Sequence, residues 1–148
     1  MIIYLDTSAL VKQYIQERAS DAVAELIEAA ENSGTAIITH VEMASALSRA
    51  VRSELIPQNE ARAAWKDFLS DWPFLTRLSL SSQIIERAAA LAWDYHLRGY
   101  DAVHFACALL WQETLSAAVT LATFDRDLWE AGQKAGMAVW PEGGSKGA

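Results

Sequence analysis

Four acidic side chains lie where carboxylates that are distant along the chain could do chemistry together. They are, in chain order, Asp6, Glu42, Asp101 and Asp125. Each follows a strand-like segment or opens a helical one. Carboxylates that meet in space repel one another, and at least one pKa would rise unless cations were present. Because Mg²⁺ and Mn²⁺ prefer oxygen ligands, the pattern predicts a divalent metal site.

Each acid, taken singly, also has an ordinary structural interpretation. Thr39 and Glu42 have the spacing of a capping box, in which Glu42 would reach back to the Thr39 amide. Asp101 and Asp125 could cap helices, and Asp6 could form an Asx turn. Asp6 is the hardest to explain in this way, because it ends an apolar segment where a carboxylate is costly to bury. Only the four together favour a functional site.

Short apolar segments of strand length alternate with helical segments along the chain. Strands are expected over 2–5, 35–39, 75–80, 118–123 and 137–140. Helices are expected over 19–30, 41–55, 57–72, 84–95, 100–113 and 126–134. Gly34 and Gly99 are expected to end the helices that precede them. This order predicts an α/β three-layer sandwich, with helices on both sides of a mostly parallel sheet. Ligands bind beyond the carboxyl ends of such strands, so the four acids are expected to converge there.

Length and composition limit the classes of protein that fit. The 148 residues are 52% apolar and 21% charged, which excludes a disordered chain. One domain is expected over 1–140, followed by a disordered tail over 141–148. The net charge of −7 argues against a protein held on nucleic acid by bulk charge alone, although bound metal would reverse the sign locally.

The sequence also bears on cellular location. Cys107 is the only cysteine, so no internal disulfide can form. No signal peptide opens the chain, and no apolar run reaches the length of about 18 residues that spans a bilayer. These features favour the reducing cytoplasm and no membrane partner.

The contexts of the acids resemble those of the PIN domain, and within it the VapC-type toxins of toxin–antitoxin pairs. The matching contexts are LDTS at 5–8, Glu42 after the second strand, YDA at 100–102 and TFDRD at 123–127. The resemblance extends from residue 1 to about 140. It implies a PIN-like fold, a metal-dependent endoribonuclease acting on RNA, a protein antitoxin as partner and a homodimer.

The resemblance also assigns roles to particular residues. The three acids that hardly vary in the family correspond to Asp6, Glu42 and Asp101, and a fourth corresponds to Asp125. We expect Asp6 and Asp101 to be the principal ligands of Mg²⁺ or Mn²⁺, with Glu42 and Asp125 completing the site partly through water. Asp127 could assist or replace Asp125. Two hydroxyl residues, Thr7 and Thr123, fall at positions that often support the site in this family.

The chemistry that follows is hydrolysis of a phosphodiester bond by water bound to the metal. A divalent ion lowers the pKa of its bound water and stabilises the charge that develops on phosphate oxygens. The 2′-hydroxyl is not needed as nucleophile, so the products are expected to carry 5′-phosphate and 3′-hydroxyl ends. The alternative is a PIN-fold binding module that has lost catalysis and acts only through its protein partner.

Several other side chains could have either a functional or a purely structural role. Arg49 lies seven residues after Glu42, nearly two helical turns along the same face, where it could contact an RNA phosphate or simply pair with an acid. Arg52 and Arg98 are weaker candidates of the same kind. His104, three residues after Asp101, is expected to be packed and hydrogen-bonded rather than a metal ligand.

Overall fold

A five-stranded sheet forms the centre of the computed structural model, which describes residues 1–144. Its strands are β1 (Ile2–Leu5), β2 (Asn32–Ala36), β3 (Thr76–Leu78), β4 (Val119–Ala122) and β5 (Ala138–Trp140). They lie in the order β3-β2-β1-β4-β5, and every neighbouring pair is parallel. The carboxyl ends of all five strands therefore share one edge. The predicted α/β class with a parallel central sheet is confirmed.

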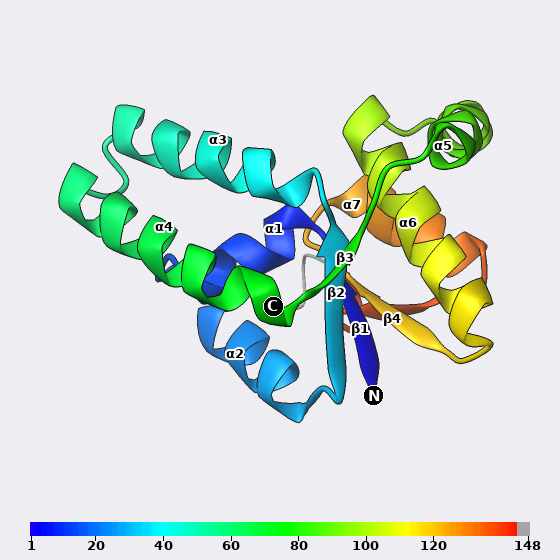
Figure 1. Ribbon diagram of the computed structural model, residues 1–148, viewed down its shortest axis with the longest axis horizontal. Coiled ribbons are helices and arrows are strands. Elements are labelled where there is room, and N and C mark those ends of the chain that lie inside the picture. The colour runs from blue at the N-terminus through cyan, green and yellow to red at the C-terminus, as the bar shows by residue number, and fades with distance from the viewer. Residues whose placement is uncertain (145–148) are drawn as a thin grey trace.

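Helices cover both faces of this sheet (Figure 1). On one side lie α1 (Thr7–Leu10), α2 (Ser20–Ala29), α3 (Thr39–Arg52) and α4 (Gln58–Asp71). On the other side lie α5 (Ser82–Tyr95), α6 (Gly99–Leu115) and α7 (Arg126–Lys134). Two short 3₁₀ turns, 11–13 and 72–74, follow α1 and α4. Among the described residues, no helix is both long enough and apolar enough to cross a membrane.

Strand β1 contributes to both hydrophobic cores. The Tyr4 side chain belongs to the core formed with α5, α6 and α7, whereas Ile3 and Leu5 belong to the core formed with α1 to α4. All three residues are fully buried. This alternation explains why 2–5 reads as continuously apolar, because both faces of a parallel strand are covered by helices. It also fixes the position of Asp6, the next residue.

The second strand lies three residues earlier than predicted. It was expected over 35–39, with Gly34 ending the preceding helix, but β2 spans Asn32–Ala36 and contains Gly34. A Cβ atom at Gly34 would lie 2.6 Å from the ring of Trp111, so only glycine lets the strand pass this side chain. The earlier strand end lets α3 begin at Thr39, which places Glu42 in its first turn.

The prediction for Gly99 is also wrong. His96 ends α5 in the left-handed conformation, with φ 56°, and Gly99 is the first residue of α6. A histidine therefore adopts the helix-ending geometry that was assigned to glycine. At the other end of the chain, the Trp129 indole N–H donates to the Pro141 carbonyl at 3.0 Å. The tail predicted over 141–148 extends into 145–148, which lie outside the described residues.

Candidate active site at the carboxyl edge of the sheet

Asp6 joins the end of β1 to the start of α1. Its Oδ1 accepts the Ala9 N–H at 3.0 Å and so caps α1. The Ser8 hydroxyl lies 2.8 and 2.9 Å from its two carboxylate oxygens, and the Thr123 hydroxyl donates to Oδ2 at 2.7 Å. Only 3% of Asp6 is exposed. Burial raises the pKa of Asp6 above its ordinary value, although the nearby His104 and these hydrogen bonds act in the opposite direction.

Glu42 is oriented by two donors from different elements. The Thr7 hydroxyl donates to Oε1 at 2.8 Å, and His104 Nε2 lies 2.6 Å from the same oxygen. Among the described residues, no donor binds Oε2. Burial alone would raise the pKa of Glu42, but the interactions with His104 and Thr7 bring it below its ordinary value. We call Asp6 and Glu42 the N-terminal pair.

His104 connects Glu42 to the core. The Tyr4 hydroxyl lies 2.9 Å from His104 Nδ1, and both side chains are buried. An ionised carboxylate only accepts hydrogen bonds, so Nε2 carries the proton that points to Glu42. In a neutral imidazole Nδ1 is then the acceptor, and the Tyr4 hydroxyl donates a hydrogen bond to it. The expectation that His104 is packed and hydrogen-bonded is confirmed.

Asp101 and Asp125 form a second pair, which we call the C-terminal pair. Asp101 lies in the first turn of α6, and Asp125 caps α7 by accepting the Leu128 N–H at 2.9 Å. The Arg98 guanidinium bridges them, with Nε 2.9 Å from Asp101 Oδ2 and Nη2 2.7 Å from Asp125 Oδ2. Burial and the charge of Asp125 raise the pKa of Asp101, even beside this arginine.

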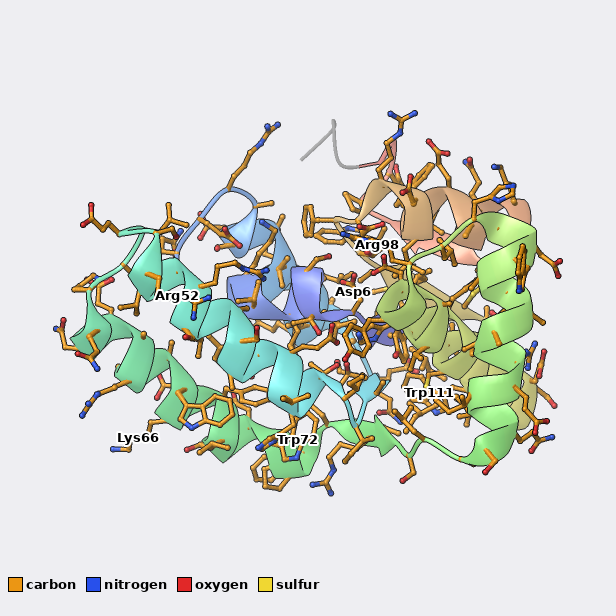
Figure 2. All side chains as sticks on the ribbon, turned by 90° about the horizontal axis from the view of Figure 1, so that it is seen from above. Asp6, Arg52, Lys66, Trp72, Arg98 and Trp111 are labelled. Carbon is orange, nitrogen blue, oxygen red and sulfur yellow. The ribbon has the colours of Figure 1, made fainter. Side chains whose placement is uncertain are left out.

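The two pairs are linked through Thr123. Its buried hydroxyl donates to Asp6 and accepts the Asp125 N–H at 3.0 Å. Ser8 adds a second link, because its oxygen accepts the Phe124 N–H at 2.9 Å. Figure 2 looks down on this edge of the sheet and shows Asp6 with Arg98 close by. The four predicted acids therefore meet at the carboxyl edge, as the topology required.

One structural interpretation fails at this edge. The candidates Asp127, Arg49 and Arg52 form no side-chain hydrogen bond with either pair among the described residues, so their roles stay predictions. Glu42 does not form the capping box, because α3 has no side-chain cap and the Glu42 carboxylate binds Thr7 and His104 instead. Asp127 lies exposed on α7. Arg49 is exposed in the last turn of α3 and has no side-chain bond to either pair. Arg52, also on α3, lies well away from Asp6 in Figure 2 and hydrogen-bonds Ser48 at 2.9 Å.

Two residues have larger roles than the sequence suggested. Arg98 was a weak candidate for an RNA contact, but it is the cation of the C-terminal pair. Ser8 was given no role at the site beyond the possible Asx turn of Asp6, although it contacts Asp6 and the backbone after β4. The spacing of Arg98 from Asp101, three residues across a helix start, was the one available signal.

The donor chemistry of the four acids suits a hard divalent ion, since all the candidate ligands are oxygens. Within residues 1–144, however, no three carboxylate, imidazole or thiol groups are arranged so that they could hold a metal ion. The hydrogen bonds explain this arrangement. Asp6 and Glu42 are turned toward protein donors, and Arg98 lies against one oxygen of each C-terminal acid. A metal ion held at this edge would compete with these donors for Asp6 and with Arg98 for the C-terminal acids, whereas Oε2 of Glu42 has no donor among the described residues.

Comparison with known proteins places the chain in a family. Residues 3–134 match the PIN domain family. The chain belongs to this family. Among its relatives, Ribonuclease VapC46 of Mycobacterium tuberculosis is 32% identical over 139 residues, which cover 93% of this chain and 95% of that protein. Ribonuclease VapC45 of the same species is 29% identical over 140 residues, 95% of each chain.

Solved structures agree with the PIN fold. FitAcB from Neisseria gonorrhoeae is 19% identical, with a TM-score of 0.63 over 95% of this chain and 97% of that one. PAE2754 from Pyrobaculum aerophilum is 20% identical, with a TM-score of 0.64 over 94% of this chain and 83% of that one. At these identities the likeness establishes the fold alone.

Proposed function

We propose that the protein is a metal-dependent endoribonuclease, which hydrolyses RNA phosphodiester bonds with a water activated by Mg²⁺ or Mn²⁺. The observation that carries the proposal is the convergence of Asp6, Glu42, Asp101 and Asp125 at one edge of a parallel sheet in a PIN fold. The relatives named as VapC ribonucleases support the choice of RNA as substrate.

The residues at this edge have separate tasks in the proposed reaction. Asp6 and Asp101 would be the principal ligands, and Glu42 and Asp125 would complete the site. When bound, the ion would lower the pKa of a water molecule and stabilise the charge that develops on the phosphate. Thr7 and His104 bind one oxygen of Glu42, which would leave Oε2 available to hold the ion. Thr123 orients Asp6 from the opposite side.

Cleavage of total RNA by purified protein tests the proposal. The wild type is expected to cut RNA with Mg²⁺ or Mn²⁺ and to stop in excess chelator, and the new ends should be 5′-phosphate and 3′-hydroxyl. Asp6→Asn and Asp101→Asn should be inactive. Asp94→Asn, an exposed acid on α5, is the matched control and should be fully active. Equal cleavage by all variants would indicate a contaminating nuclease, and activity in chelator would refute the metal mechanism.

We further propose that the nuclease is the toxin of a toxin–antitoxin pair, a homodimer that acts in the cytoplasm and is inhibited by a protein antitoxin. The support is the naming of the relatives as VapC proteins. Co-expression with a small protein encoded next to this gene should abolish cleavage and yield a stable complex. Light scattering on the protein alone should give twice the chain mass. Failure of both would leave only the nuclease.

The alternative, a PIN-fold binding module without catalysis, would give a different result. In that case the wild-type protein and the Asp6→Asn variant would bind the partner equally well, and neither would cut RNA. The presence of all four acids in a hydrogen-bonded arrangement favours the nuclease.

A further inference from the structure

Arg98 differs from the other arginines and lysines that form ion pairs in the described part of the chain. Lys12, Arg87 and Arg126 each pair with one glutamate. Arg98 bridges two aspartates, and these come from different helices, α6 and α7. Its two contacts reach Oδ2 of both residues. Arg98 is thus the cation that joins the C-terminal pair.

The two aspartates need such a cation more than ordinary surface acids do. Their side chains are only 15% and 20% exposed, so water screens them poorly. The charge of Asp125 is one of the two causes that raise the pKa of Asp101. Like charges held this close by two helix starts repel unless a positive charge lies between them. In this structure that charge is the guanidinium.

The guanidinium is held loosely. The Arg98 side chain is 76% exposed, and Arg98 is itself the residue that precedes α6. Open space surrounds the neighbouring Gly99, where a Cβ would meet nothing within 4 Å. Water reaches the guanidinium itself, so solvent competes for Arg98 even though the two carboxylates are largely buried. Arg98 can therefore swing into solvent without disturbing the packing of the protein.

A divalent ion and the guanidinium would compete for the same place. The guanidinium lies against the Oδ2 atoms of Asp101 and Asp125. A divalent ion held by the same two carboxylates would lie close to it, and two cations at that separation repel each other. We propose that Arg98 is a built-in counter-cation, which holds the C-terminal pair in the metal-free protein and leaves when a divalent ion binds. This inference rests on the proposed function, because it takes the metal to bind at these acids. It makes Arg98 a negative regulator of metal affinity.

The test is Mn²⁺ binding, measured by titration at pH 7 without RNA. If Arg98 occupies the C-terminal pair in most molecules of the metal-free protein, its removal should raise the apparent affinity for Mn²⁺. Arg98→Ala is therefore expected to bind Mn²⁺ about fivefold more tightly than wild type. The matched control is Arg126→Ala. Arg126 adjoins Asp125 and is 73% exposed, but it pairs with Glu130 instead. Its loss changes the net charge equally and should alter the affinity by less than about twofold.

A second measurement follows the protein without metal. In chelator, Arg98→Ala should unfold at a lower temperature than wild type, because the C-terminal pair has lost its cation. Saturating Mn²⁺ should then raise its unfolding temperature by more than it raises that of wild type. A merely structural arginine would give the first effect without tighter Mn²⁺ binding.

The outcomes separate this inference from the proposed function. Tighter binding by Arg98→Ala alone supports the counter-cation. Equal gains by Arg98→Ala and Arg126→Ala would show that only the net charge matters and would overturn it, as would unchanged or weaker binding by Arg98→Ala. If Mn²⁺ bound to no variant and not to wild type, the metal mechanism itself would be wrong.

Discussion

The two pairs of acids at the carboxyl edge are held in different ways. The N-terminal pair receives its hydrogen bonds from hydroxyls, a backbone amide and an imidazole, all of which belong to the folded core or its rim. The C-terminal pair is joined by one exposed guanidinium. Folding alone therefore orients Asp6 and Glu42, whereas the contact between Asp101 and Asp125 runs through a side chain that is exposed to solvent.

This difference has a physical cause. Hydrogen bonds from buried groups are short-ranged and little affected by salt, and leaving such a group unpaired is costly. An exposed ion pair is screened by salt and gains little over solvation by water. The N-terminal pair thus resembles a preorganised site, and the C-terminal pair resembles an exchangeable one.

The largest expected effect is on catalysis when the preorganised pair loses a charge. Asp6→Asn is expected to lower RNA cleavage by about 100-fold or more, because a metal ion contributes several kcal/mol to such reactions. Asp125→Asn should cost less, about tenfold, since an asparagine can still cap α7 and two other acids remain beside Asp101. Initial rates on total RNA measure both. Asp127→Asn, the exposed neighbour, should be unchanged, and a loss there would show that Asp127 replaces Asp125.

The next effect tests whether orientation of Glu42 matters apart from its charge. His104→Leu removes the donor on Oε1 and should lower cleavage and Mn²⁺ affinity by about 10- to 100-fold, as losses of groups that orient metal ligands do. His104→Gln keeps an N–H donor and should recover part of both. Circular dichroism must first show that the variants are folded. Full activity of a folded His104→Leu protein would mean that Thr7 alone orients Glu42.

Much of this site could be predicted from the sequence, for reasons that are local. Asp6 was placed correctly because 2–5 is continuously apolar and a parallel strand buried on both faces must end at the ligand-binding edge. Glu42 was placed in a first helical turn although the strand before it was set three residues too late, because α3 begins at Thr39, only two residues before the predicted start. His104 was expected to be packed and hydrogen-bonded because hard metal ions favour oxygen ligands over imidazole.

What could not be predicted depends on contacts between distant segments. Gly34 looked like a helix end because nothing nearby in sequence shows that Trp111 packs against it. Arg98 could not be assigned to two acids without the distance between the starts of α6 and α7. Arg49 is exposed at the predicted helical spacing from Glu42, and its contact with an RNA phosphate stays a prediction.

Thr123→Val tests the link between the two pairs. The valine removes the Thr123 donor to Asp6 Oδ2, where only the Ser8 hydroxyl shared with Oδ1 remains. It also leaves the Asp125 N–H without an acceptor, so unfolding should become easier by about 1 to 3 kcal/mol. Thr123→Ser keeps the hydroxyl and should lose only about 0.8 kcal/mol, for one buried methyl. Denaturant titration measures the free energy of unfolding. If valine and serine were equivalent, the hydroxyl would not be the link.

The smallest effect concerns stability against pH in the absence of metal, and it has opposite signs for Glu42 and Asp101. The pKa of Glu42 is lowered in the folded protein, so its charged form stabilises the fold above its unfolded pKa, and this contribution is lost as the pH falls through the folded pKa. Glu42→Gln should therefore be less stable than wild type at pH 7, by about 1 kcal/mol for the weakened hydrogen bonds. The difference should vanish in acid.

The pKa of Asp101 is raised, so the sign is reversed. Its charged form costs stability above the folded pKa, and the cost disappears as the pH falls below the unfolded value. In chelator, Asp101→Asn should be more stable than wild type at pH 7 and equal to it in acid. Thermal unfolding from pH 3 to 8 measures both variants. If both substitutions lowered stability at pH 7, Arg98 would hold Asp101 as firmly as the core holds Glu42. The distinction between a preorganised and an exchangeable pair would then be wrong.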